Sequence, residues 1–305
     1  GSCLMKWESH TEATSHTLLV PGNGHPPFSE TALDFLDTSK REELLADMFV
    51  GVHIEVLPDP GGDDASGYKI AHSLLGARSL YGGAMSKNGA AVWSAFRLDA
   101  SGFVRLVIVD GGISERRLAR LLQRLLDMET YRMLAMRAMP AARVAMSTAQ
   151  ELEPQLVEVM RNLAADDSPE SREKALHKIA DLSAQVEEIA ASHSSRFSGA
   201  RAYARIVERR IEEVDETIID GHQRYTNFLS RALAPAMRTC DAAELRVSEL
   251  AQRVARSANL LSTMVGIQQS HQNQRVLKSL ADSARRQLRV QQAVEGFSIF
   301  AISYY

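Results

Sequence analysis

The chain has 305 residues, with 35 lysines and arginines against 38 aspartates and glutamates, and a formal net charge of −3 at pH 7. That length has room for about two domains and for a buried core. The near-neutral charge excludes the overall basic field that marks many nucleic-acid-binding proteins, so no nucleic-acid partner is expected. The two cysteines, Cys3 and Cys240, are too few and too widely separated for a disulfide framework or a zinc site.

Residues 1–112 are predicted to form a strand-rich α/β head domain. Short apolar runs alternate there with turn segments rich in Gly, Pro and Asp. The predicted strands cover residues 6–18, 49–57, 91–98 and 103–109, the short helices lie within 30–49 and 68–77, and turns are expected at 82–83 and 87–89. The segment 99–102 between the last two strands has the length of a hairpin loop.

From Ser114 onward the sequence changes to long helical patterns. Ser114 is a good N-cap, and leucines at helical spacing after it predict a helix toward Leu163, kinked at Pro140. Ser168 and Pro169 predict the start of the next helix, because serine caps helices and proline is tolerated at the first helical position.

The second and third long helices share a 3-4 spacing of apolar residues. In the second helix the spacing runs from Leu176 to Ile218, and Asp220-Gly221 is expected to reverse the chain. In the third helix the apolar positions are Leu229, Leu233, Ala236, Cys240, Val247, Leu250, Val254 and Leu261. Such sustained spacing predicts a long antiparallel, coiled-coil-like stalk. A single long hairpin rarely buries every apolar position, so a homo-oligomer is expected.

A polar tract at residues 268–274 interrupts this spacing. Its side chains in line with the seam include Gln268, His271, Gln272 and Asn273. Polar residues in a helical seam commonly fix the register or the oligomeric state. If several stalks lie side by side, the same residues could instead line a water-filled axial path.

The C-terminal end is basic and then apolar. Arg275, Lys278, Arg285, Arg286 and Arg289 accompany one anion, Asp282, and residues 296–305 carry no charge. A transmembrane helix needs about 20 apolar residues, so we interpret residues 293–305 as the start of a truncated transmembrane helix whose remainder is missing. Cations beside a span favour the cytoplasmic face, and the −6 charge of residues 1–112 suits a head held away from an anionic leaflet. The alternative is a basic helix with an amphipathic tail docked on the domain.

Two groups of side chains could hold a divalent cation. Glu8, His10 and Glu12 fall on one face of the predicted first strand, and His53 and Glu55 share a face of another. The alternative is a solvated strand face with local hydrogen bonds. No nucleophile motif, phosphate loop or dinucleotide-binding pattern is present, so neither catalytic residues nor an organic cofactor are predicted.

Several stretches of the chain resemble one known family. They are Trp7-Glu8-Ser9-His10-Thr11-Glu12, Val92-Trp93-Ser94-Ala95-Phe96-Arg97, Met128-Glu129-Thr130-Tyr131-Arg132-Met133, Arg196-Phe197-Ser198-Gly199-Ala200-Arg201-Ala202-Tyr203, Leu233-Ala234-Pro235-Ala236-Met237-Arg238-Thr239-Cys240 and Gln291-Gln292-Ala293-Val294-Glu295-Gly296-Phe297-Ser298. These stretches look like the bacterial family of predicted membrane-anchored proteins called domain of unknown function three-four-two-two. The resemblance implies a cytoplasmic part at the bacterial inner membrane, followed by C-terminal spans. It carries over no activity.

The combined interpretation is an α+β protein. It has a strand-rich α/β head at residues 1–112, a long-helix stalk at 113–292 and the start of a truncated transmembrane helix at 293–305. The predicted function is that of a membrane-anchored, self-associating scaffold or interaction protein without enzymatic activity. The alternative is the soluble domain of a CorA-like divalent-cation channel or transporter, which the order of the elements resembles at the level of architecture alone.

Overall fold

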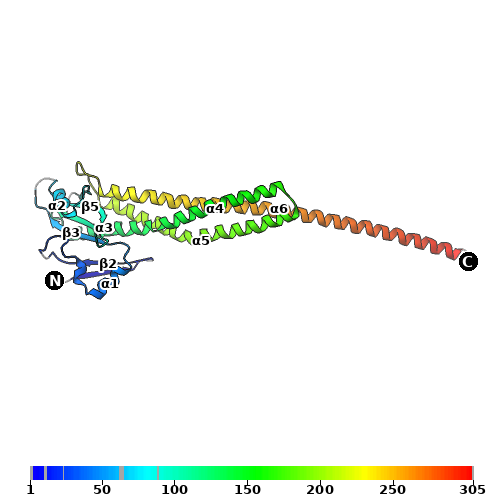
Figure 1. Ribbon diagram of the computed structural model, residues 1–305, viewed down its shortest axis with the longest axis horizontal. Coiled ribbons are helices and arrows are strands. Elements are labelled where there is room, and N and C mark those ends of the chain that lie inside the picture. The colour runs from blue at the N-terminus through cyan, green and yellow to red at the C-terminus, as the bar shows by residue number, and fades with distance from the viewer. Residues whose placement is uncertain (1–2, 10–11, 23, 62–64, 88, 304–305) are drawn as a thin grey trace. The chain divides into compact units, whose positions relative to one another are not determined.

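The computed structural model describes residues 3–9, 12–22, 24–61, 65–87 and 89–303, with side chains described as far as residue 291 in the last helix. Two small sheets near the N-terminus precede long helices, so the predicted α+β class with a strand-rich head and a helical stalk is confirmed (Figure 1). The chain divides into two compact units. The first comprises residues 1–142 and 194–242, and the second comprises residues 143–193 and 243–305.

The first sheet of unit 1 is an antiparallel hairpin of β1 (Leu4–Ser9) and β2 (Thr14–Leu19). The prediction of one strand over residues 6–18 is therefore wrong. Trp7 pairs with His16, and the chain reverses between Ser9 and Thr14. Alternating polar and β-branched residues form strands well, but alternation alone does not show where a strand turns back on itself.

The second sheet has four strands in the order β3-β6-β5-β4. They are β3 (Val52–Pro58), β4 (Tyr81–Met85), β5 (Ala90–Leu98) and β6 (Val104–Asp110), with β3 parallel to β6 and the other pairs antiparallel. Along the chain, the 3-10 helix η1 (Ala32–Phe35) and the helix α1 (Thr38–Ala46) precede β3, and α2 (Ala65–Leu75) lies between β3 and β4. The hairpin of β5 and β6 and the helices within 30–49 and 68–77 are confirmed, the last beginning three residues earlier than predicted.

Both faces of the four-stranded sheet are covered. Val92, Leu106 and Ile108 belong to one buried cluster, which also takes in residues of α3, α5 and α6. Trp93, Val107 and Val109 alternate with them along the same strands and belong to a second cluster with Ala71 of α2. Period-two alternation thus places successive β5 and β6 side chains in two separate cores.

Gly82 and Gly83 lie inside β4, so the turn predicted at 82–83 is wrong. A Cβ atom at Gly82 would collide with the Val92 carbonyl oxygen and with the Trp93 ring, and one at Gly83 would lie 2.7 Å from the Glu216 Oε1. Two adjacent glycines here permit close approach of neighbouring segments rather than a reversal of the chain.

Two long helices follow the sheet. α3 (Glu115–Met136) begins after Ser114, which is the predicted N-cap, and α4 (Ala138–Ala165) begins two residues after α3 ends. Pro140 explains the break: its ring nitrogen cannot donate to the carbonyl oxygen four residues earlier, and its ring crowds that same carbonyl. The predicted kink at Pro140 is therefore realised as a helix boundary at Arg137.

α5 (Pro169–Glu213) begins at the predicted proline, and the Ser168 hydroxyl accepts the Ser171 N–H at 3.2 Å. Its end differs from the prediction, which continued the helix to Ile218. After Glu213 the chain becomes extended, and Thr217 and Gln223 form bridges with Ala84 and Tyr81 of β4. These backbone contacts with a sheet edge replace the last turns of helix.

α6 (Tyr225–Ser303) has the predicted register. All eight apolar positions expected at 3-4 spacing between Leu229 and Leu261 are buried. In α5 the buried positions include Ile179, Val186 and Phe197. Ala175 and Leu182 are buried where Leu176 and Ser183 were expected, a shift of one position on the helix.

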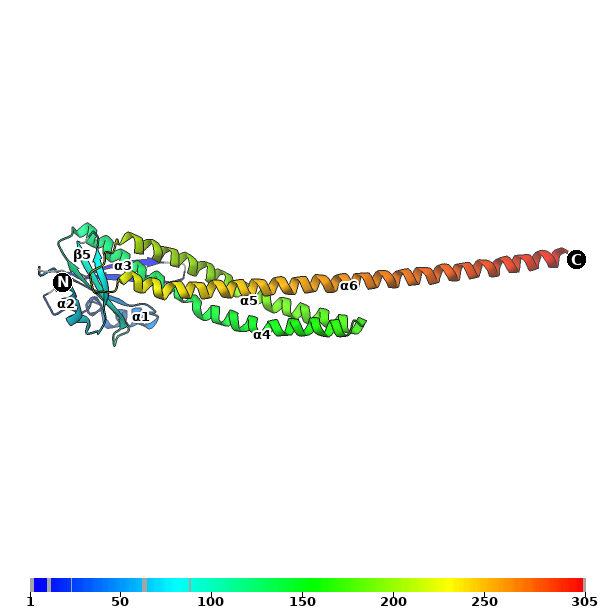
Figure 2. The same ribbon diagram turned by 90° about the horizontal axis from the view of Figure 1, so that it is seen from above.

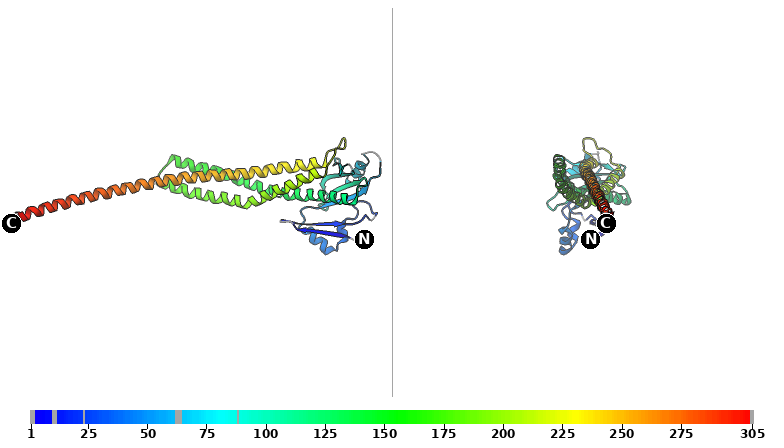
Figure 3. Two further views of the ribbon diagram at one scale, coloured as in Figure 1. Left: turned by 180° about the vertical axis from the view of Figure 1, so that it is seen from behind. Right: turned by 90° about the vertical axis from the view of Figure 1, so that its right-hand side faces the viewer.

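Unit 2 contains parts of α4, α5 and α6, which Figure 2 shows from above. Its buried side chains include Leu152 and Leu156 of α4, Leu182 of α5 and Leu250 of α6. Beyond the turn between α4 and α5, α6 continues without a companion helix, as Figure 3 shows from behind. No helix in the described part of the chain combines the length and apolar character that crossing a membrane requires.

Candidate functional site

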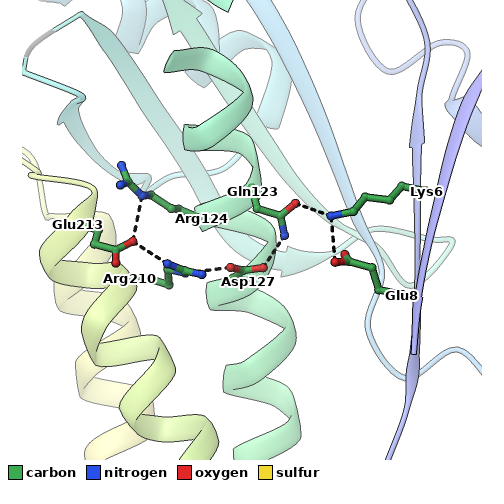
Figure 4. A network of polar contacts seen from close by, with 7 residues as sticks. All are labelled: Lys6, Glu8, Gln123, Arg124, Asp127, Arg210 and Glu213. Carbon is green, nitrogen blue, oxygen red and sulfur yellow. Dashed lines mark hydrogen bonds and ion pairs between the residues drawn. The ribbon is translucent and has the colours of Figure 1, made fainter. Parts of the chain in front are cut away.

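A row of seven polar side chains in unit 1 joins the β1–β2 hairpin to α3 and α5 (Figure 4). The Lys6 ammonium contacts the Glu8 carboxylate at 2.9 Å and donates to the Gln123 Oε1 at 3.1 Å. Gln123 in turn donates through its Nε2 to the Asp127 carboxylate at 2.7 Å. The residues lie on three elements that are distant in sequence, so the row exists only in the folded head.

Arg210 of α5 lies at the centre of the charged half of this row. Its Nε donates to Asp127 at 2.9 Å, and its Nη1 donates to Glu213 at 2.7 Å. Arg124 donates to the same Glu213 oxygen at 3.1 Å. A guanidinium that engages two carboxylates in this way fixes the orientation of both.

The contacts within the row stabilise the charged forms of Glu213 and Arg210. The hydrogen bond from Arg210 lowers the pKa of Glu213, and Arg124 adds to that effect. Partial burial acts to lower the pKa of Arg210, but its bonds to Glu213 and Asp127 outweigh burial and raise that pKa. Burial, followed by the charges of Asp127 and Glu8, raises the pKa of Tyr131. At neutral pH the Glu213 carboxylate is therefore a poor proton acceptor, and the row positions elements rather than moving protons.

The other face of β1 carries two exposed apolar side chains, Met5 and Trp7. Because side chains alternate along a strand, Met5 and Trp7 point away from the side on which Lys6 contacts Gln123 of α3. Trp7 is 64% exposed and Met5 is 40% exposed. Their cross-strand neighbours on the same face are His16 and Leu18. The polar row thus holds one face of the hairpin while the other presents an exposed tryptophan.

A second polar group is buried in unit 1. The Glu129 carboxylate is 1% exposed, accepts the Tyr225 hydroxyl at 3.0 Å and pairs with the Arg132 guanidinium at 2.6 Å. Burial, followed by the Glu129 charge, raises the pKa of Tyr225 well above its usual value, so the hydroxyl keeps its proton. This group links α3 to the first turn of α6.

The Glu216 carboxylate caps the N-terminus of α6 from outside the helix. Its two oxygens accept the backbone N–H groups of Tyr225 at 2.7 Å and Thr226 at 2.9 Å, and the Thr226 hydroxyl also donates to it. A carboxylate at this position satisfies N–H groups that have no partner within the helix and interacts favourably with the helix dipole.

The described residues of the two predicted groups of cation ligands lie at different sheets of unit 1. Glu8 lies on β1 and pairs with Lys6, and Glu12 lies between the two strands of the hairpin. The chain reversal after Ser9 removes the common strand face on which the grouping of Glu8 with Glu12 was based. His10 lies outside the described residues.

His53 and Glu55 lie on β3, in the other sheet. The His53 ring stacks on Phe103 with centroids 4.0 Å apart, and the Glu55 carboxylate accepts the Phe28 N–H at 3.0 Å. Burial is the largest cause of the lowered pKa of His53. Within the ranges that the structure describes, no three His, Cys, Asp or Glu side chains come together in a way that could hold a metal ion.

The predicted polar tract divides into two parts. Gln268 accepts a hydrogen bond from the Arg172 guanidinium, which also pairs with Asp167 in the turn between α4 and α5. His271, Gln272 and Asn273 are exposed on α6. The Gln268 side chain therefore joins α6 to the first turn of α5. The other three side chains lie farther along α6 than this contact.

Local sequence patterns do not single out Asp127, Arg210, Glu213, Glu129 or Glu216 as functional residues. A signal for Glu129 exists, since it occurs between Met128 and Met133 on a helix with a strong apolar face, three residues before an arginine. The others flank apolar seams at ordinary surface-like positions. The pairing of Asp127, Arg210 and Glu213 depends on contacts between α3 and α5. The contact of Glu216 depends on the chain bringing it to the N-terminus of α6, and no local pattern reveals either arrangement.

A mixed head with two small sheets, followed by long helices held by internal ion pairs, defines the structural class of this protein. The family model described as "Protein of unknown function (DUF3422)" matches residues 1–305, and the chain belongs to that family. The family resemblance seen in the sequence is thereby confirmed over the whole chain. Comparisons with curated proteins and with solved structures gave no match.

Proposed function

We propose that this chain is the cytoplasmic part of a membrane-anchored bacterial protein that self-associates and acts as a scaffold or interaction protein without enzymatic activity. The observation that carries the proposal is the exposed face of the β1–β2 hairpin. Trp7 is 64% exposed there, while Lys6 holds the opposite face through Gln123 of α3. Tryptophan is strongly enriched among the residues that dominate protein–protein binding, and exposed aromatic patches on rigid elements mark interaction sites.

The polar groups of unit 1 support a structural rather than a catalytic role. Glu213 is held by two arginines, and buried Glu129 is held by Arg132 and Tyr225. A general base needs a pKa near the working pH and a proton within reach. The contacts of these carboxylates favour the charged form of Glu213 and leave neither group open to a substrate.

The membrane part of the proposal is supported by the C-terminal sequence. Five cations between Arg275 and Arg289 precede a run from 296 to 305 without any charge. Cations in this position favour the cytoplasmic side of an adjoining span.

Self-association is tested by the mass of the chain in solution. Light scattering after size-exclusion chromatography should give a multiple of 33.6 kDa at rising protein concentration. The Trp7→Ser variant should shift toward the monomer, because it removes the largest exposed apolar side chain of the hairpin face. Leu98→Ser is the matched control, since Leu98 is 69% exposed at the end of β5. A monomer at every concentration would refute self-association, and an unchanged mass of the Trp7→Ser variant would remove the hairpin as its surface.

A cation-conducting role is the second candidate, motivated by the order of a mixed head followed by long helices. It requires full-length protein in liposomes. Saturable magnesium or cobalt entry, absent from empty liposomes and from a protein without its spans, would make this role the primary one. Absence of flux from folded, oligomeric protein would leave the scaffold.

A further inference from the structure

The part of α6 beyond Gln268 stands apart from the remainder of unit 2. The Gln268 side chain of α6 accepts a hydrogen bond from the Arg172 guanidinium near the start of α5. From Gln269 to Gln291 every side chain except Asp282 is exposed. Figures 1 and 3 both show this part, coloured orange to red, running on alone. We call residues 275–291 the cationic segment.

The cationic segment has two chemically different faces. With 3.6 residues per turn, Leu277, Leu280, Ala284 and Leu288 fall in one stripe. Leu277, Leu280 and Leu288 are 65%, 60% and 58% exposed. The five cations, Arg275, Lys278, Arg285, Arg286 and Arg289, fall on the opposite side of the helix. Within the described part of the chain none of these five forms an ion pair.

The net charge of the cationic segment limits which surfaces can bind to it. Five cations and one anion give it a net charge of +4, so two copies brought together along it would repel each other. The heptad through Leu277, Leu280 and Ala284 also places Asn273, Gln287 and Gln291 in the seam. A coiled coil requires apolar residues at most seam positions over several heptads. The segment therefore lacks both the seam and the charge pattern for packing against itself.

We infer that the cationic segment binds the surface of a bilayer containing anionic phospholipids. Leu277, Leu280 and Leu288 enter the boundary between headgroups and acyl chains, and the arginines and the lysine contact lipid phosphates. A helix with cations on one face and leucines on the other lies in such an interface, and its attraction to anionic lipid adds to the burial of apolar area. This inference rests on the proposed membrane association and names its residues and lipid chemistry.

The experiment measures binding of the 305-residue chain to two kinds of vesicle, phosphatidylcholine alone and phosphatidylcholine mixed with phosphatidylglycerol. The ratio of the two affinities isolates the electrostatic part from any apolar insertion by residues 296–305. The test variant combines Lys278→Glu, Arg285→Glu and Arg289→Glu. The matched control combines Arg161→Glu, Lys178→Glu and Arg231→Glu, which change net charge equally at exposed positions outside the segment.

The wild type and the control should prefer anionic vesicles. The test variant should lose about a hundredfold or more of its affinity for them, at about fivefold per charge removed. Raising the salt concentration should reduce the wild-type preference. Circular dichroism confirms that each variant remains helical.

Three outcomes would overturn the inference. They are equal wild-type affinity for both vesicles, an equal loss in the test and control variants, and a changed mass in solution of the test variant with unchanged vesicle binding. The last outcome would make the segment an interface between copies. Failure here, with the oligomer still sensitive to Trp7→Ser, would leave the proposed scaffold role standing.

Discussion

The Tyr225 hydroxyl donates a hydrogen bond to the buried Glu129 carboxylate across a distance of 3.0 Å, joining α3 to the first turn of α6. Glu129 also pairs with Arg132, whose Nε is buried without a hydrogen-bond partner among the described residues. A buried charge depends on each of its partners, because losing one leaves the charge partly uncompensated.

Replacing Tyr225 by Phe should therefore lower the free energy of unfolding by about 2 kcal/mol, the usual contribution of a buried hydrogen bond to a charged group. Urea denaturation of both proteins measures the difference. Tyr203→Phe is the control, since no described residue forms a hydrogen bond to the Tyr203 hydroxyl. This variant should lower the free energy of unfolding clearly less than Tyr225→Phe does. Equal losses in the two variants would show that the Tyr225 hydroxyl adds nothing beyond packing.

The capping role of Glu216 gives a second prediction. Glu216→Ala leaves the Tyr225 and Thr226 N–H groups without their acceptor and should cost about 2 kcal/mol of stability. Glu216→Gln keeps one acceptor oxygen and should cost less. Amide hydrogen exchange at Tyr225 and Thr226 should accelerate in the same order. Exchange that stays at the wild-type rate in Glu216→Ala would contradict the capping role.

The sequence predicted the long helices better than the sheets. The eight apolar positions predicted at 3-4 spacing from Leu229 to Leu261 are all buried, because a pattern sustained over several turns constrains one face of a helix strongly. Ser168 and Pro169 likewise marked the start of α5, since capping acts within a few residues.

Long-range contacts explain the errors. The end of α5 depends on bridges between Thr217 or Gln223 and β4, and the polar row depends on α3 and α5 approaching each other. The predicted common strand face of Glu8 and Glu12 is wrong, because residues on either side of a turn do not keep the period of one strand. None of these contacts leaves a signal within a short window of sequence.

Gly82 illustrates such a contact and gives a third prediction. In β4 its Cα faces the Val92 carbonyl and the Trp93 ring so closely that a methyl group has no room. Gly82→Ala should therefore cost about 3 kcal/mol. Gly67→Ala is the control: its Cβ would meet Val109 at ordinary van der Waals distances of 3.6–3.7 Å, and the helix should gain about 0.8 kcal/mol. A tolerated Gly82→Ala would mean that β4 lies farther from β5.

The Arg210 network predicts a specific acid dependence. Because the folded-state pKa of Glu213 lies below its ordinary value of 4.5, the ion pair stabilises the fold above that pH and loses its effect as pH falls through the lowered pKa. Arg210→Met should cost about 1 kcal/mol at neutral pH, a small value because both groups are partly exposed. That difference from wild type should shrink in acid. Arg209→Met, at the exposed neighbouring position, should show neither effect, and a difference that persists unchanged in acid would contradict the ion-pair origin.

His53 predicts a separate dependence at milder pH. Burial against Phe103 is the largest cause of its lowered pKa, and Arg105 lowers it further while Asp99 and Asp34 oppose the shift. The unfolded chain takes up a proton near the ordinary imidazole value of 6.5 before the folded chain does, so stability falls as pH drops below that value. His53→Phe keeps a ring stacked on Phe103 and removes the titration. Urea midpoints should therefore decline less for His53→Phe than for wild type between neutral and mildly acidic pH, whereas His271→Phe on the exposed part of α6 should decline like wild type. Parallel declines in all three proteins would show that the folded state accepts a proton on His53 as readily as the unfolded chain does.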